Sequence, residues 1–144
     1  MRLPDFELEV FFGKYEFSTP YLLAQSDCES MRIEELLALE PDPEKARRDF
    51  MQTWLGYSPN DGGPELRQAL AGLYEKMGWQ DVLLFSGAQE GIFACMNVLL
   101  EPQDHVICMF PAYQSLYELP RAVGCQVDFW RFEALGGTEG WQLS

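Results

Sequence analysis

The sequence predicts an α/β fold in three layers, with a partial and mostly parallel sheet. From residue 81 onward, short apolar runs alternate with longer helical runs, in the order strand, helix, strand, helix, strand. That alternation is typical of parallel strands joined by helical crossovers. Hydrophobic residues make up 47% of the 144 residues, which is enough for the core of a single domain.

Residues 1–54 predict an N-terminal helical arm. The stretch 31–39 contains helix formers with its apolar residues on one face, so we expect a short helix there. Asp42 and Pro43 have the character of an N-cap followed by a first-turn proline. They predict a second, charged helix that runs on through residue 54.

The middle of the chain predicts a turn and then a helix. Residues 58–63 are rich in turn-forming residues, and Pro64 suits the first position of a helix. Apolar residues follow at helical spacing as far as Met77, and Gly78 predicts the end of this helix.

The last 64 residues supply the predicted α/β unit. Its strands are expected at 81–85, 105–110 and 125–132, and its helices at 88–100 and 113–123. The tail from residue 133 is polar and glycine-rich, and it predicts a connection without a further element.

The charge balance disfavours nucleic acid as a partner. Ten basic and 23 acidic residues give a net charge of −13, a field that repels phosphate backbones. One small anion is still compatible with this charge, because a local cluster of backbone amides can outweigh the global field.

The sequence predicts no metal site and no membrane segment. The four cysteines lack C-x-x-C spacing, and His105 is the only histidine, whereas zinc needs a denser set of ligands. The N-terminus is charged where a signal peptide is apolar, and no apolar run reaches the length of a membrane span. We therefore expect a cytoplasmic protein.

A candidate anion site lies where the first predicted strand meets the next helix. Ser86 and Gly87 form this corner, at the carboxyl edge of the sheet where α/β proteins bind ligands. The first amides of a helix lack intrahelical partners and favour a phosphate, and Gly87 leaves room for one. The alternative is a capping box, in which Ser86 and Gln89 exchange hydrogen bonds and no ligand is needed.

Two tyrosines are further candidates. Tyr113 follows the second predicted strand in the sequence Phe-Pro-Ala-Tyr, so its ring can face the same crevice and stack on a flat, electron-poor ring. Packing against the next helix explains Tyr113 equally well. Tyr57 precedes the turn 58–63 and can reach an anion or a partner subunit; alternatively, this segment is only a well-capped surface helix.

Taken in order, these segments resemble a known family. The stretch "GYSPNDGGPELRQALAGLY" is followed by "LLFSGAQEGIFACMNVLL", by "HVICMFPAYQSLYELPRAVG", and then by a strand and "GW". This series is similar to the class I/II aminotransferases, the fold-type I enzymes that use pyridoxal 5′-phosphate. The likeness covers residues 55–142 well and 21–39 more loosely. It implies the large domain of the pyridoxal phosphate-dependent transferase fold, with 1–54 as an arm and 55–144 as an incomplete first part.

The resemblance also implies roles for particular residues. The corner residues hold the cofactor phosphate through backbone amides, and Tyr113 stacks on the pyridine ring. Tyr57 resembles the tyrosine that reaches the phosphate of the other subunit, so a homodimer is expected. The cofactor-binding residues implied are Ser86, Gly87, Ala88, Gln89, Tyr113 and Tyr57.

The resemblance does not extend to the catalytic lysine. In the family a lysine forms a Schiff base with the cofactor, and it comes later in the sequence than residue 144. Lys14, Lys45 and Lys76 do not follow a strand edge that faces the crevice. The resemblance implies amino-group transfer between an amino acid and a 2-oxo acid. We expect no catalytic residue in these 144 residues. We also expect the chain to be part of a longer enzyme or a truncated product. The alternative is a non-catalytic module for dimerisation or ligand binding. Many relatives present a glycine to the substrate in the loop that corresponds to residues 24–27. This loop has no glycine here, so we assign it no role in the site.

Overall fold

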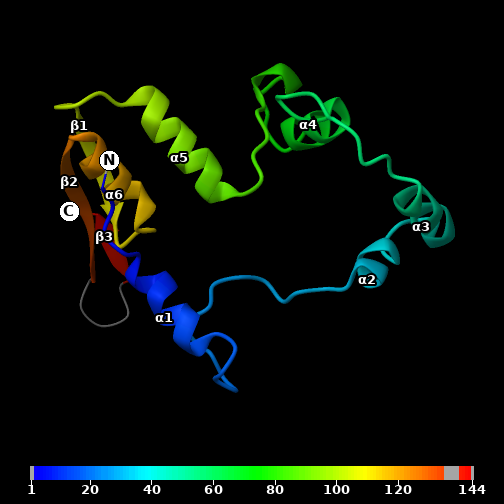
Figure 1. The fold of residues 1–144 in the computed structure, drawn as a ribbon, viewed down its shortest axis with the longest axis horizontal. Coiled ribbons are helices and arrows are strands. Elements are labelled where there is room, and N and C mark those ends of the chain that lie inside the picture. Colours follow the sequence, from blue (N-terminus) through cyan, green and yellow to red (C-terminus); the bar gives the residue numbers. More distant parts are fainter. Residues whose placement is uncertain (1, 135–139, 144) are drawn as a thin grey trace.

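Two parallel strands and the helix between them form a packed α/β unit at one side of the fold, on the left in Figure 1. The computed structural model describes residues 2–134 and 140–143. Strands β1 (His105–Phe110) and β2 (Gln126–Ala134) pair in parallel, and α6 (Ser115–Val123) is the crossover between them. The predicted strand–helix–strand unit and the α/β fold class are therefore confirmed.

Helix α6 packs on the β1–β2 pair through an aromatic cluster. The ring centroids of Phe110 and Phe129 are 4.6 Å apart, and Tyr117 meets Phe129 edge-on at 5.3 Å. The guanidinium of Arg121 lies 5.2 Å from the centre of the Phe129 ring. Each aromatic pair adds about 0.5–1.5 kcal/mol beyond the area it buries. Since Leu119 is also buried, this face of α6 is firmly seated on the sheet.

A third strand completes the described sheet. Strand β3 (Trp141–Leu143) pairs antiparallel with the end of β2, so the strand order is β1-β2-β3. The expectation that the tail forms no further element is therefore wrong. The pairing with β1 ends at Arg131, so the last three residues of β2 have unpaired backbone groups, and this short segment pairs with them.

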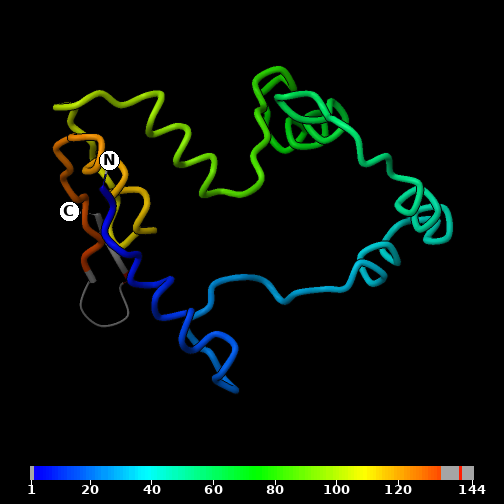
Figure 2. Tube along the Cα trace, viewed as in Figure 1, coloured from blue at the N-terminus to red at the C-terminus, as the bar shows by residue number. Residues whose placement is uncertain are grey.

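The helices outside this unit follow one another along a wide arc. After α1 the chain leaves the sheet, passes through α2, α3 and α4, and returns along α5 (Figure 2). Asp42 caps α3 by accepting a hydrogen bond from the Lys45 amide at 2.9 Å, as predicted, although the helix ends at Met51. The bounds are α1 (Glu7–Tyr15), α2 (Ile33–Leu37), α3 (Pro43–Met51), α4 (Pro64–Ala71) and α5 (Ala88–Leu99).

Two predictions for the middle of the chain are wrong. The helix that starts at Pro64 ends at Ala71 instead of Met77, because Gly72 closes it and the chain turns back into the 3₁₀ turn η1 (Trp79–Asp81). Residues 82–85 are extended but form no strand. A strand needs a hydrogen-bonded neighbour, and within the described residues this segment makes one long-range backbone bond, from Leu84 to Asp61 at 3.2 Å.

A buried arginine joins α4 to η1. Arg67 is only 5% exposed, pairs with the Asp61 carboxylate, and donates to the Gln80 carbonyl at 3.3 Å. Its guanidinium carbon lies 5.0 Å from the centre of the Trp79 ring. A buried charge is stable only when paired and hydrogen-bonded, so these contacts hold α4 and η1 together.

Removing the Asp61 carboxylate should destabilise this unit. Breaking a fully buried pair costs about 3–5 kcal/mol. The Asp61 side chain is half exposed, so for Asp61→Ala we expect a loss of about 2 kcal/mol in the free energy of unfolding, measured by urea denaturation. The control is Asp49→Ala, which removes the exposed partner of Lys45. Equal midpoints for the two variants would show that the Arg67 pair does not stabilise the fold.

Candidate functional site

The start of α5 carries unpaired backbone amides. Its N-cap is Gly87, at φ 150° and ψ 159°, and no side chain caps the helix. The amides of Ala88 and Gln89, in the first turn, donate to no acceptor within the described residues. Together with the positive end of the helix dipole, these amides can bind an anion.

The capping box considered from the sequence is wrong. That box needs Ser86 as the N-cap, whereas the N-cap is Gly87, one residue later. Ser86 therefore lies outside the helix, and its amide donates to the Glu90 carboxylate at 2.7 Å. Glu90 puts a negative charge at the same helix end, where it competes with any bound anion.

Gly87 is required by its backbone conformation and not by crowding. A Cβ atom at this position would meet no atom within 4 Å, so the space beside Gly87 is open. The combination of a positive φ with this ψ is restricted essentially to glycine. The open space and the free amides fit a phosphate group.

Tyr113 lies beyond the end of β1, after the cis Phe110–Pro111 peptide bond. Its hydroxyl donates to Oε1 of Glu9 in α1 at 3.0 Å. The side chain is 39% exposed, so part of the ring is free to contact another molecule. This contact is with α1 and not with the next helix, α6, against which packing was the expected alternative.

Two hollows flank Tyr113. The smaller, about 190 Å³, lies between the start of α1 and Gln114. The larger, about 290 Å³, is lined by α1 residues and by the loop 24–27. Three carboxylates line the larger hollow, and their field favours a cationic group over an anionic one. They belong to Glu9, Glu16 and Asp27.

Two of these contributions could not be predicted from the sequence. The loop 24–27 carried no weight because it lacks the glycine of the relatives, yet it lines the hollow beside Tyr113. Glu9 is 104 residues away from Tyr113 along the chain, and no spacing rule connects them.

The two main candidate features lie at one end of the sheet. Figure 1 shows α5 and α6 both beginning toward the end where β1 finishes, so the free amides and Tyr113 both lie toward the carboxyl edge. Among the described elements, α5 packs on α6 and not on the strands. Neither hollow beside Tyr113 is lined by residues 86–89, however. Tyr57 joins neither feature: it lies in the connection between α3 and α4 and is fully exposed.

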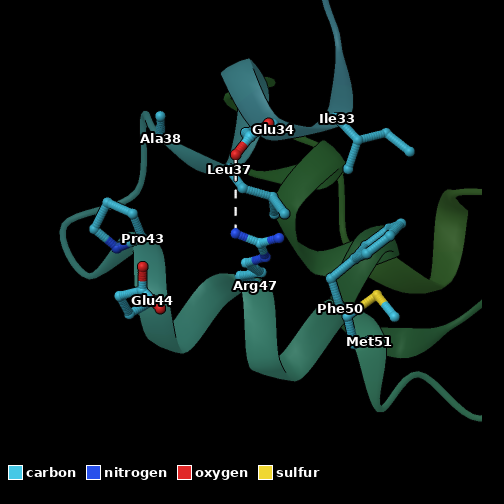
Figure 3. A pocket seen from close by; sticks show the side chains of 9 residues that line it. All are labelled: Ile33, Glu34, Leu37, Ala38, Pro43, Glu44, Arg47, Phe50 and Met51. Carbon is cyan, nitrogen blue, oxygen red and sulfur yellow. Dashed lines mark ion pairs between the residues drawn. The ribbon is translucent and has the colours of Figure 1, made fainter.

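A larger hollow lies away from this edge. Figure 3 shows it between α2 and α3, with a volume of about 340 Å³. Ile33, Leu37 and Phe50 give it an apolar lining, and Arg47 reaches across to Glu34 at 3.8 Å. It lies on different elements from the free amides and from Tyr113, so it contributes nothing to their chemistry.

The other titratable groups suggest no separate chemistry. Burial raises the pKa of the Cys108 thiol above its ordinary value of 9.0, which keeps it protonated and poorly nucleophilic. In the part of the chain that the structure describes, no group of three or more His, Cys, Asp or Glu side chains is arranged to hold a metal ion. No helix among these residues is long and apolar enough to cross a membrane.

Comparisons of the sequence and of the structure with known proteins point to the same family. Residues 21–143 match the family described as aminotransferase class I and II. The aspartate aminotransferase of Pyrococcus horikoshii is 34% identical over an alignment of 102 residues, and the match covers 60% of this chain and 26% of that protein. An aspartate/prephenate aminotransferase of Thermus thermophilus is 32% identical over an alignment of 101 residues, and the match covers 62% of this chain and 26% of that protein.

A solved structure extends the match. The crystal structure of a PLP-dependent aminotransferase from Streptococcus suis superimposes with a TM-score of 0.83 at 34% identity, and the match covers 92% of this chain and 36% of that one. The chain thus spans 26% of the length of the two curated relatives above.

The backbone at Gly87 can be tested with a matched pair of substitutions. Neither Gly87 nor Gly13 has an atom within 4 Å of an added Cβ, but only Gly87 has a positive φ. Gly87→Ala should lower the free energy of unfolding by about 1–3 kcal/mol. Gly13→Ala, inside α1, should raise it by up to about 1 kcal/mol. Thermal or urea unfolding measures both, and a neutral Gly87→Ala would contradict the assigned conformation.

Proposed function

The chain belongs to the class I and II aminotransferase family, and we propose that it forms the first part of that family's cofactor-binding domain. In this proposal residues 1–54 are an arm and residues 55–144 begin the domain. Family membership implies pyridoxal phosphate as the cofactor. When bound, it supplies an electron sink for chemistry at the α-carbon of an amino acid.

One observation carries the proposal: unpaired helix amides and a half-exposed tyrosine ring both lie toward the carboxyl edge of the sheet. The Ala88 and Gln89 amides would hold the phosphate, and Ser86 and Gly87 would shape the corner. The Tyr113 ring would lie against the pyridine ring. A ligand with both a phosphate and a flat ring explains why both features occur at this edge.

Tyr57 has a separate role in the proposal. It is fully exposed, and no contact within the described residues holds it. We assign it to the phosphate of a partner subunit, which accounts for an exposed aromatic side chain on a long connection. The homodimer and the cytoplasmic location stay predictions.

The proposed reaction is amino-group transfer between an amino acid and a 2-oxo acid. The Pyrococcus and Thermus relatives act, by their names, on aspartate and on aspartate or prephenate. This chain's own contribution is to bind and orient the cofactor.

The three lysines do not suit the covalent step. No lysine lines either hollow beside Tyr113. A hydrogen bond from Lys45 to Asp49, with the carboxylate charge, raises the pKa of Lys45 above 10.5 and keeps its amine protonated. A protonated amine cannot attack a carbonyl. We therefore propose that these 144 residues bind the cofactor weakly and do not transaminate by themselves.

Cofactor binding can be followed by amide NMR. Titration with pyridoxal phosphate should shift the Ala88 and Gln89 amide resonances, because their N–H groups would donate to the phosphate. Pyridoxal, which lacks the phosphate, is the control and should leave these two resonances in place. Shifts confined to other regions, such as the hollow between α2 and α3, would contradict the proposed site.

The same samples test the lysines. After borohydride reduction, mass spectrometry should find no lysine that carries one cofactor per chain. Stoichiometric labelling of Lys14, Lys45 or Lys76 would overturn the claim that this chain lacks the catalytic lysine.

The second candidate is a non-catalytic module for dimerisation or ligand binding. Its support is the exposure of large apolar side chains on several segments of the chain, which a partner or a second copy could cover. Among the most exposed are Phe17, Leu23, Leu55 and Val98. Sedimentation equilibrium together with thermal unfolding tests this second function. A discrete dimer that melts cooperatively supports the module, whereas a monomer or an open-ended aggregate counts against it.

A further inference from the structure

We infer that α1 positions Tyr113 and that Glu9 is the positioning residue. This rests on the proposed function, in which the Tyr113 ring lies against the cofactor. Glu9 does not contact the cofactor in this inference. It acts through the Tyr113 hydroxyl, which donates a hydrogen bond to Oε1 of Glu9 at 3.0 Å.

Gln114 fixes the start of α1 beside Tyr113. Its Oε1 accepts a hydrogen bond from the Glu7 amide at 2.9 Å, and its Nε2 donates to the Asp5 carbonyl at 3.1 Å. The N-cap residue Phe6 makes no side-chain capping bond, so Gln114 satisfies the first helix amide that would otherwise be unpaired. One side chain therefore sets both the position and the direction of the helix start.

This attachment places Glu9 opposite Tyr113. Glu9 is the third residue of α1, two residues after Glu7, which Gln114 holds. Tyr113 immediately precedes Gln114. Two neighbouring residues thus bind two points in one turn of α1, and the helix cannot shift along its axis without breaking both contacts.

Anchoring the hydroxyl restricts the orientation of the ring. A tyrosine side chain has two rotatable angles, and a fixed hydroxyl at its far end limits both. Stacking on a flat ligand needs one orientation of the ring plane. A ring that is already oriented loses less conformational freedom on binding, so the ligand binds more tightly.

The charge of Glu9 makes the inference testable. A carboxylate near the site repels an anionic cofactor, so loss of Glu9 should tighten binding if only its charge matters. If Glu9 positions Tyr113, the same loss should weaken binding. The two explanations therefore predict opposite changes in the affinity for the cofactor.

The ring itself can be observed without any cofactor. The chain is labelled with 3-fluorotyrosine, and the ¹⁹F resonance of Tyr113 is identified by its loss in Tyr113→Phe. Glu9→Leu should shift this resonance, while Glu9→Gln, which keeps an acceptor oxygen, should largely preserve it. Glu16→Leu is the matched control, because Glu16 lines the same hollow and has no hydrogen bond to Tyr113. Identical spectra for Glu9→Leu and the unmodified chain would overturn the inference.

Binding of pyridoxal phosphate gives the second readout. Glu9→Leu and Tyr113→Phe should each raise the dissociation constant about fivefold, and the double variant should be no weaker than either single variant. Unchanged or tighter binding by Glu9→Leu would overturn the inference. If Glu9→Leu fails to fold, Tyr113→Phe, which removes only the hydroxyl, must still weaken binding.

Tyr113→Ala distinguishes this inference from the proposed function. If removal of the ring leaves cofactor binding unchanged, the proposed function fails, whatever the ¹⁹F spectra show. If removal of the ring weakens binding but Glu9→Leu does not, the proposed function stands and the positioning role of Glu9 is wrong.

Discussion

The parallel pairing of β1 and β2 is the constraint on which the candidate site depends. Parallel strands need a crossover that returns the chain to the starting edge, and α6 provides it. The crossover must begin at the carboxyl edge of the sheet, which is why Tyr113 lies there. The aromatic contacts of Phe129 with Phe110 and Tyr117 hold the crossover against the strands. Helix α5 also begins toward this edge, with its unpaired amides.

Local and global electrostatics act in opposite directions at this edge. The chain carries a net charge of −13, and Glu90 adds a carboxylate at the start of α5. Two free amides and a helix dipole must therefore attract a phosphate against a negative surround. A weak intrinsic affinity follows, and supporting features such as an oriented Tyr113 ring gain importance.

The sequence was most informative where structure is local. Alternating apolar runs predicted β1, α6 and β2, and Asp42 with Pro43 predicted the start of α3. Prediction from the sequence failed where contacts between residues far apart in the chain determine the structure. Residues 82–85 are apolar enough for a strand but have no neighbouring strand among the described residues. The helix from Pro64 stops early because Gly72 closes it and the chain turns back into η1, and the contact of Glu9 with Tyr113 links residues 104 positions apart.

The central claim is that the start of α5 and the Tyr113 ring serve one ligand. The most direct measurement is a crystal structure of the chain with pyridoxal phosphate bound. The phosphate oxygens should lie within hydrogen-bonding distance of the Ala88 and Gln89 amides, with the pyridine ring stacked on Tyr113. A cofactor bound in the apolar hollow between α2 and α3, or at any place remote from both features, would contradict the claim.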